Sequence, residues 1–202
     1  MPLWLAEEPL VLASRSKARQ TLLKASGIPV EVHPADLDER GLEAAACSTM
    51  PGAIAAHLAR AKVSAVAKLR PGRLTLGADQ TLALGAERFA KPVDRTAARA
   101  QLRALRGQTH ELHSAIALAK DENVLFEFVG VARLTMRPLS NRYLDLYLDA
   151  AGDAATTSVG GYQVESLGIQ LFERVDGDYF TVLGLPLLQV LEFLRRQGCL
   201  AQ

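Results

Sequence analysis

Apolar positions recur with a changing period along the first third of the chain. The run at 9–13 is apolar, and the segment after Ser16 repeats apolar residues at helical spacing up to Gly27. The segment 29–34 alternates and has a proline at each end. In order, these patterns predict a strand at 9–13, a helix between Ser16 and Gly27, a strand at 29–34, an acidic loop at 36–40 and a helix from Pro51 to Pro71.

The rest of the chain carries further strand and helix signals. Two alternating segments flank Gly85-Ala86, which predicts two strands and a turn and places Asp79 near a strand end. The strongest hairpin signal is a pair of long extended segments joined at 121–123. The remaining predictions are a helix from about Asp94 to Leu105, strands at 109–119 and 123–137, a helix from Ser140 to about Ala150, a hairpin turn at Asp176-Gly177 and a closing helix from Pro186 to Arg196.

Strands and helices are interleaved, without an internal repeat or a low-complexity linker. This order predicts an α/β fold with a long mixed sheet. The length of 202 residues permits one large domain or two small lobes, and we favour one unit over residues 1–202. Hydrophobic residues make up 49% and charged residues 22%, which is typical of a folded globular chain rather than a disordered one.

The charge balance argues against two classes of partner. Lys plus Arg total 23 and Asp plus Glu total 22, so there is no global positive field of the kind that draws a protein to nucleic acid. No run of about 18 apolar residues occurs, and the first ten residues do not resemble a secretory leader. We therefore expect a cytoplasmic protein that binds neither nucleic acid nor membrane, with any attraction for anions confined to a local site.

Cysteine, histidine and serine motifs contribute little to the prediction of function. Cys47 and Cys199 lack the spacing of a zinc site or a disulfide framework, and we regard both as incidental thiols. His110 and His113 would point to opposite faces of a strand, and neither they nor His33 and His57 show metal-ligand spacing. The GxSxG elbow of a serine hydrolase is absent.

A polar segment at 14–19 separates the first predicted strand from the first predicted helix. It combines two serine hydroxyls with the cations Arg15, Lys17 and Arg19 at the start of a helix, where backbone N–H groups are free. These groups together suit a phosphate chain. The alternative is a serine helix cap beside solvated basic residues. The segment matches neither a Walker loop nor a GxGxxG fingerprint.

A second candidate lies in the middle of the chain. Asp79 and Gln80 belong to an apolar strand, and Lys91 follows the next hairpin. A carboxylate that emerges from a strand can act as a general base or hold a divalent ion, and a nearby lysine can offset phosphate charge. The alternative for Asp79 is a turn residue.

Two more features are ambiguous on local grounds. The acidic loop contains Asp36, Asp38 and Glu39, whose hard oxygen ligands suit magnesium or manganese. By itself, however, this composition favours a solvated loop. Lys62, in the predicted helix after Pro51, is by the same local standard a surface lysine.

The order of these segments is more specific than any one of them. The chain contains, in succession, LVLASRSKAR, DLDE, the helix with Lys62, LGADQTLAL, AKP, LRGQTHELHSAIAL and GGYQVESLGIQLFERVDGDYFTVLGLPL. This succession resembles the Maf family of nucleotide pyrophosphatases from about residue 10 to about residue 196.

The resemblance implies a fold, an activity and a set of site residues. It implies an elongated mixed sheet flanked by helices, with two lobes around a cleft as in inosine triphosphatases, and a homodimer. The implied reaction is metal-dependent cleavage between the α and β phosphates of a nucleoside triphosphate. By position in the motifs, the triphosphate is held by Ser14, Ser16 and Arg19, the proton acceptor is Asp79, and the other active-site members are Glu39, Lys62 and Lys91. Our own hypothesis is that the Mg or Mn ion is held near Glu39 and Asp79.

Three positions bear on the choice of base. Gln80 and Glu165 stand where the thymidine and uridine triphosphate branch usually has threonine and glutamine, and Ala18 replaces a common arginine of the thymidine branch. The combination resembles the branch acting on 7-methyl-GTP, in which an anionic Glu165 would bind a guanine edge. Two alternatives stay open: a non-catalytic nucleotide-binding regulator of septum formation, and a phosphatase that releases orthophosphate.

Overall fold

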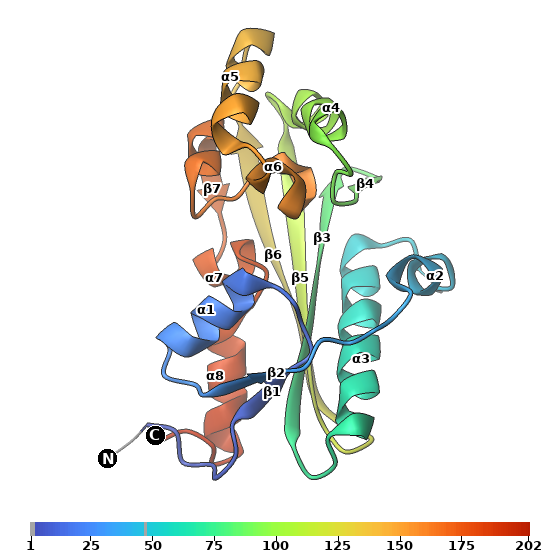
Figure 1. The fold of residues 1–202 in the computed structure, drawn as a ribbon, viewed down its shortest axis with the longest axis vertical. Helices are drawn as coiled ribbons and strands as arrows, with labels where there is room; N and C mark the ends of the chain where they lie inside the picture. Colours follow the sequence, from blue (N-terminus) through green and yellow to red (C-terminus); the bar gives the residue numbers. More distant parts are fainter. Residues whose placement is uncertain (1–2, 47) are drawn as a thin grey trace.

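The computed structural model describes residues 3–46 and 48–202, so Cys47 lies outside the described residues. Three long antiparallel strands form the centre of a seven-stranded mixed sheet: β3 (Leu74–Leu84), β5 (Thr109–Lys120) and β6 (Asn123–Met136). The sheet order is β2-β1-β3-β5-β6-β7, and β4 pairs with β3. These three strands run along the length of the molecule in Figure 1.

One half of the molecule, the N-terminal lobe, is built around the first strands. β1 runs parallel to both β2 and β3. Its core includes Leu12, Leu76 and Leu118, which come from three different strands. The elements of this lobe are β1 (Leu10–Leu12), α1 (Lys17–Ala25), β2 (Val30–Val32), α2 (Glu39–Ala44), α3 (Pro51–Leu69) and α8 (Leu187–Arg196).

The other half, the distal lobe, has a separate core that includes Leu82, Leu102 and Leu112. β3 and β5 supply residues to both cores, so the two lobes share one sheet. The elements of the distal lobe are β4 (Glu87–Phe89), α4 (Arg95–Leu105), α5 (Asn141–Ala151), α6 (Ala154–Thr157), the 3-10 turns η1 (Val159–Gly161) and η2 (Leu167–Leu171), and β7 (Phe172–Asp176). The short helix α7 (Tyr179–Val182) leads back to α8 (Figure 1). The prediction of a mixed sheet, flanking helices and two lobes is confirmed.

Close packing of α3 on the sheet determines where its polar residues lie. Small α3 side chains, among them Ala59, pack on Ala115 and Ala117 of β5. A Cβ atom at Gly77 of β3 would collide with the carbonyl oxygen of Ala59. The absence of a side chain at Gly77 therefore lets α3 approach β3, and it places Lys62 beside the middle of that strand.

Two local predictions are wrong. Asp79 lies in the middle of β3 rather than near a strand end, because the strand continues through 81–84 to reach the distal lobe. The segment 36–40 is not loop throughout, since α2 begins at Glu39 and the Asp38 side chain caps it by accepting a hydrogen bond from the Gly41 N–H at 3.1 Å.

The predicted hairpin turn at Asp176-Gly177 is also wrong. β7 ends at Asp176, and α7 follows instead of a strand. The side chain of Asp178 accepts a hydrogen bond from the Thr181 N–H at 2.8 Å and so caps that helix. Gly177 has a φ of +127° and packs tightly on Ala132, which a side chain would prevent.

His110 is fully buried in the distal lobe, and its Nε2 lies 2.6 Å from the hydroxyl of Tyr162. Burial lowers the pKa of His110 from 6.5 to about 4. The unfolded chain therefore takes up a proton between these values while the folded chain does not, so stability is lost as the pH falls from 6.5 toward 4.

We expect the wild type to lose about 2 kcal/mol of unfolding free energy between pH 7 and pH 5 through this histidine. A His110→Gln variant keeps a hydrogen-bonding group for Tyr162 but does not titrate, so it should lack this contribution. Urea denaturation of both proteins at the two pH values measures the difference. Equal losses in the two proteins would contradict the assignment to His110.

Within residues 3–46 and 48–202, no helix is both long enough and apolar enough to cross a membrane.

Candidate active site

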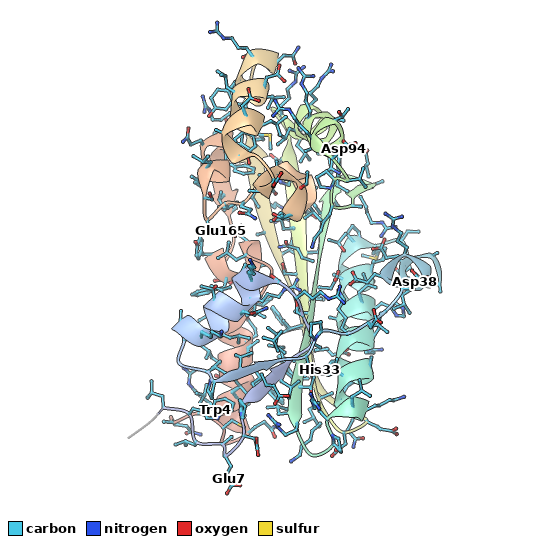
Figure 2. All side chains as sticks on the ribbon, viewed as in Figure 1. Trp4, Glu7, His33, Asp38, Asp94 and Glu165 are labelled. Carbon is cyan, nitrogen blue, oxygen red and sulfur yellow. The ribbon has the colours of Figure 1, made fainter. Side chains whose placement is uncertain are left out.

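A cavity of about 650 Å³ lies between the two lobes. In Figure 2, Glu165 and Asp38 lie on opposite sides of the long central strands. The cavity wall contains all the residues that the family resemblance assigns to the site: Ser14, Ser16, Arg19, Glu39, Lys62, Asp79, Gln80, Lys91 and Glu165. Of the acidic segment, Asp36 also lines the cavity, whereas Asp38 does not. Of the three cations in the 14–19 segment, Arg15 and Arg19 line the cavity, whereas Lys17 does not belong to its wall.

The two serines of this segment hold the start of α1. Ser16 is the N-cap, and its side chain accepts a hydrogen bond from the Arg19 N–H at 3.4 Å. The Ser14 hydroxyl accepts from the Ser16 N–H at 3.3 Å and from Arg19 Nη1 at 3.1 Å. The helix-cap alternative is therefore correct for Ser16, yet both serines also line the cavity.

Arg19 is buried and connects three parts of the chain. Its Nε donates to the carbonyl of Gly184 at 2.8 Å, and its Nη1 donates to the carbonyl of Ala78 at 2.8 Å as well as to Ser14. Burial lowers the pKa of Arg19, although Asp79 and Glu39 oppose this shift, and an arginine stays charged. These bonds leave Nη2 without a partner among the described residues, so this amino group is available to a phosphate in the cavity.

The lack of a side chain at Gly184 leaves room for the Arg19 guanidinium. Its φ is +85°, in the left-handed region that favours glycine, and a Cβ there would lie 3.3 Å from Arg19 Nη2 and 3.6 Å from the Gln80 Cδ. The turn between α7 and α8 thus brings a carbonyl acceptor to Arg19 without covering its free amino group.

Lys62, Asp79 and Glu39 form one charged cluster. Lys62 Nζ lies 2.6 Å from Asp79 Oδ1 and 3.0 Å from Glu39 Oε1. Lys62 is only 9% exposed and Asp79 only 8%, so the local interpretation of Lys62 as a surface residue is wrong. Glu39 is more open, with half of its side chain exposed.

The environment of Asp79 suits a proton acceptor. Burial raises the pKa of Asp79 above its ordinary value, and this effect outweighs the opposing charges of Lys62 and Arg19; Glu39 raises it further. A more basic carboxylate is a better general base for water, provided that it is ionised at the working pH.

The acidic residues suit a metal ion that arrives with a phosphate chain. Among the residues that the structure describes, no group of three or more His, Cys, Asp or Glu side chains is placed to hold a metal. Glu39 and Asp79 nevertheless direct carboxylate oxygens at one point, now taken by Lys62 Nζ. Magnesium is commonly bound by one or two carboxylates together with substrate phosphates and water, so these two residues fit such an ion.

Gln80 lies on the opposite face of β3 from Asp79, as alternation along a strand requires. Its Nε2 donates to Ser114 Oγ at 2.8 Å and to the carbonyls of Val182 and Thr181 at 3.1 and 3.3 Å. Ser114 is fully buried and itself donates to the Thr181 carbonyl at 2.7 Å. Sequence reasoning missed Ser114, because its role depends on the β3–β5 register, which pairs it with Gln80.

The wall of the distal lobe carries the remaining predicted residues. Lys91 and Glu165 are both exposed. Tyr162 and Gln163 line the same wall, and Gln163 Nε2 donates to Thr157 Oγ1 at 2.8 Å. Sequence reasoning did not identify these two residues as part of the site. Their proximity to Glu165 in the sequence was the one signal that could have indicated it.

The fold and the cavity together define a two-lobed α/β protein whose central cleft combines buried cations, hydroxyls and a buried carboxylate. A family described as "Maf-like protein" matches residues 9–197, and the chain belongs to this family.

Individual relatives agree with that assignment. Two proteins of Rhodopseudomonas palustris named "Nucleoside triphosphate pyrophosphatase" are 57% and 58% identical to this chain over 100% of both chains. A Brucella abortus protein named "7-methyl-GTP pyrophosphatase" is 49% identical over 95% of this chain and 97% of its own length.

Proposed function

We propose that this chain is a metal-dependent nucleoside triphosphate pyrophosphatase, which converts a nucleoside 5′-triphosphate and water to the monophosphate and pyrophosphate. The observation that carries the proposal is the convergence of the N-terminal polar segment with the mid-chain carboxylate. Arg19 donates a hydrogen bond to the carbonyl of Ala78, the residue next to Asp79, and both side chains line one cavity. The names and the high identity of the relatives support the same activity.

In this mechanism the cations and hydroxyls hold the phosphate chain and align it for attack. The groups involved are Ser14, Ser16, Arg19, Lys62 and Lys91. A magnesium or manganese ion near Glu39 and Asp79 would supply charge neutralisation for the phosphates. Asp79 accepts a proton from water, the water oxygen bonds to the α phosphorus, and the bond from that phosphorus to the bridging oxygen breaks. Pyrophosphate leaves with the electron pair.

A turnover assay with purified protein separates this activity from its alternatives. With excess triphosphate and magnesium or manganese, we expect many equivalents of pyrophosphate per protein chain. Binding without product would instead support a nucleotide-binding regulator of septum formation, and release of orthophosphate would support a phosphatase. A cytoplasmic location stays a prediction from the pattern of apolar and charged residues, and a homodimer stays a prediction from the family resemblance. Sedimentation of the purified protein tests the homodimer.

Glu165 is our candidate for base selection, and we propose a preference for 7-methyl-GTP or a related purine nucleotide. The side chain is exposed on the cavity wall, where an anion can accept hydrogen bonds from a guanine edge and attract a base made positive by methylation. The name of the Brucella abortus relative supports this choice.

The Glu165→Gln variant should lower the ratio of kcat/KM for 7-methyl-GTP to that for GTP by about tenfold, the value of roughly one charge-assisted hydrogen bond. A panel of methylated and unmodified triphosphates, with product analysis, measures this ratio. Glu173→Gln, an exposed change on β7 away from the cavity, is the matched control. An unchanged ratio in Glu165→Gln would remove Glu165 from base selection.

A further inference from the structure

Helix α2 contributes Glu39, Arg40 and Glu43 to the cavity wall and has little to anchor it. It has only six residues, and none of them is buried. A helix this short has no stability of its own in water, so its side-chain contacts decide where it lies. Its start is well defined, because Asp38 caps it and a side chain at Gly41 would collide with the Asp38 carboxylate. At its other end, the C-cap Ala45 is held by a backbone hydrogen bond from its N–H to the carbonyl of Gly41 at 3.0 Å.

Two glutamates on α2 contact opposite lobes. Glu39 and Glu43 are one turn apart and share a helix face. Glu39 binds Lys62 of α3, in the N-terminal lobe, at 3.0 Å. Glu43 Oε2 lies 3.3 Å from Nη1 of Arg88, which belongs to β4 in the distal lobe.

Arg88 is on the same side of the sheet as the charged cluster. It pairs with Ala83 of β3, and Ala83 lies four residues from Asp79, so the three side chains project from one face. Glu43 and Arg88 both line the cavity. The Glu43–Arg88 pair therefore joins the lobes on the side of the cleft where Asp79 lies.

We propose that the Glu43–Arg88 ion pair is a positioning contact that holds α2 against the distal lobe and so keeps Glu39 beside Lys62 and Asp79. This inference rests on the proposed function, because its catalytic consequence passes through Glu39. Neither Glu43 nor Arg88 needs to touch substrate. About a third of the Arg88 side chain and 41% of the Glu43 side chain are exposed. Because water weakens an exposed ion pair, we expect the loss of either residue to have a modest effect on the position of α2.

The test combines two single variants, a charge swap and a control. Glu43→Gln and Arg88→Met each remove the pair, whereas the double variant Glu43→Arg with Arg88→Glu restores it with reversed charges. Glu87→Gln, an exposed change on the same strand outside the cavity wall, is the control. Hydrogen exchange of the segment 38–46 in nucleotide-free protein reports on α2, and the magnesium concentration at half-maximal rate reports on Glu39.

We expect both single variants to speed exchange in this segment by about two- to fivefold, and to raise the required magnesium concentration by a similar factor with little change in kcat at saturating metal. The charge swap should bring both quantities back toward wild type, and Glu87→Gln should change neither.

Three results would overturn the inference. Unchanged exchange in the single variants would show that the pair does not hold α2, and altered exchange with normal metal dependence would show that its position does not serve Glu39. A strong loss in Arg88→Met alone, not restored by the swap, would show that Arg88 contacts the phosphate chain directly. If the wild type releases no pyrophosphate, the proposed function fails, and hydrogen exchange still decides whether the pair holds α2.

Discussion

Replacing Asp79 with asparagine should lower kcat by about 10²- to 10⁴-fold, the usual contribution of a positioned general base. Asparagine has almost the same shape and keeps an oxygen that can accept a hydrogen bond from Lys62. It cannot accept a proton from water at neutral pH, and it is a poorer ligand for a divalent ion. Because Asp79 is only 8% exposed, bulk solvent cannot readily replace it as the proton acceptor.

The assay is single-turnover and steady-state hydrolysis at saturating magnesium or manganese, with the thermal unfolding midpoint measured in parallel. Asp149→Asn, an exposed carboxylate on α5 away from the cavity, is the matched control and should keep wild-type activity. Near-normal turnover of Asp79→Asn with the metal saturated would show that the proton acceptor lies elsewhere.

Replacing Arg19 with methionine should affect both substrate use and stability. The change removes the free Nη2 group from the cavity, and the loss of one or two charge-assisted hydrogen bonds to phosphate should lower kcat/KM by about 10- to 100-fold. It also leaves the carbonyls of Ala78 and Gly184 without their donor. Unsatisfied buried acceptors of this kind should lower the unfolding free energy by roughly 3 kcal/mol.

Two further variants separate these effects. Arg19→Lys keeps the positive charge but cannot form the forked contacts, so its kcat/KM should lie between those of wild type and Arg19→Met. Lys17→Met removes an exposed cation of the same segment that is not part of the cavity wall, and it should change neither quantity. A destabilised Arg19→Met protein with unchanged kcat/KM would mean that Arg19 serves the fold alone.

Sequence patterns predicted the elements whose signals are local. The hairpin at 109–137 followed from two long alternating segments, and the structure turns between them at Asp121, whose φ is +56°. Ser140 caps its helix as expected from its position before an apolar stripe, and Ser16 caps α1 as the alternative interpretation of its segment proposed. Such signals succeed because the residues that determine the conformation are close together in the chain.

Two causes explain the failures: helix caps that the sequence interpretation did not use, and contacts between residues distant in the chain. Asp176-Gly177 has the composition of a hairpin turn, but Asp178 caps a helix, and Gly177 packs against Ala132 of β6. β3 passes through Asp79 without ending, since it contributes to both cores. The Asp178 cap is a local signal, whereas the Ala132 contact and the continuation of β3 depend on residues far away in the chain.

The same limit applies to the site. The residues around Lys62 predict that it lies on the surface. In the structure it is buried, because Gly77 lets α3 approach the sheet closely. Its assignment to the site came from the order of motifs across the chain and not from its own surroundings. Ser114 lies in the segment LRGQTHELHSAIAL, but no role was assigned to it there, and Glu43 and Arg88 belong to none of the motifs. The strand register and the position of α2 reveal what these residues contact.

Hydrolysis in water enriched in oxygen-18 most directly tests whether the cleft directs water to the α phosphorus. Mass spectrometry of the products should find one heavy oxygen in the nucleoside monophosphate, none in the pyrophosphate, and the two products in equal amounts. Heavy oxygen in the pyrophosphate, or release of orthophosphate in its place, would contradict the proposed mechanism.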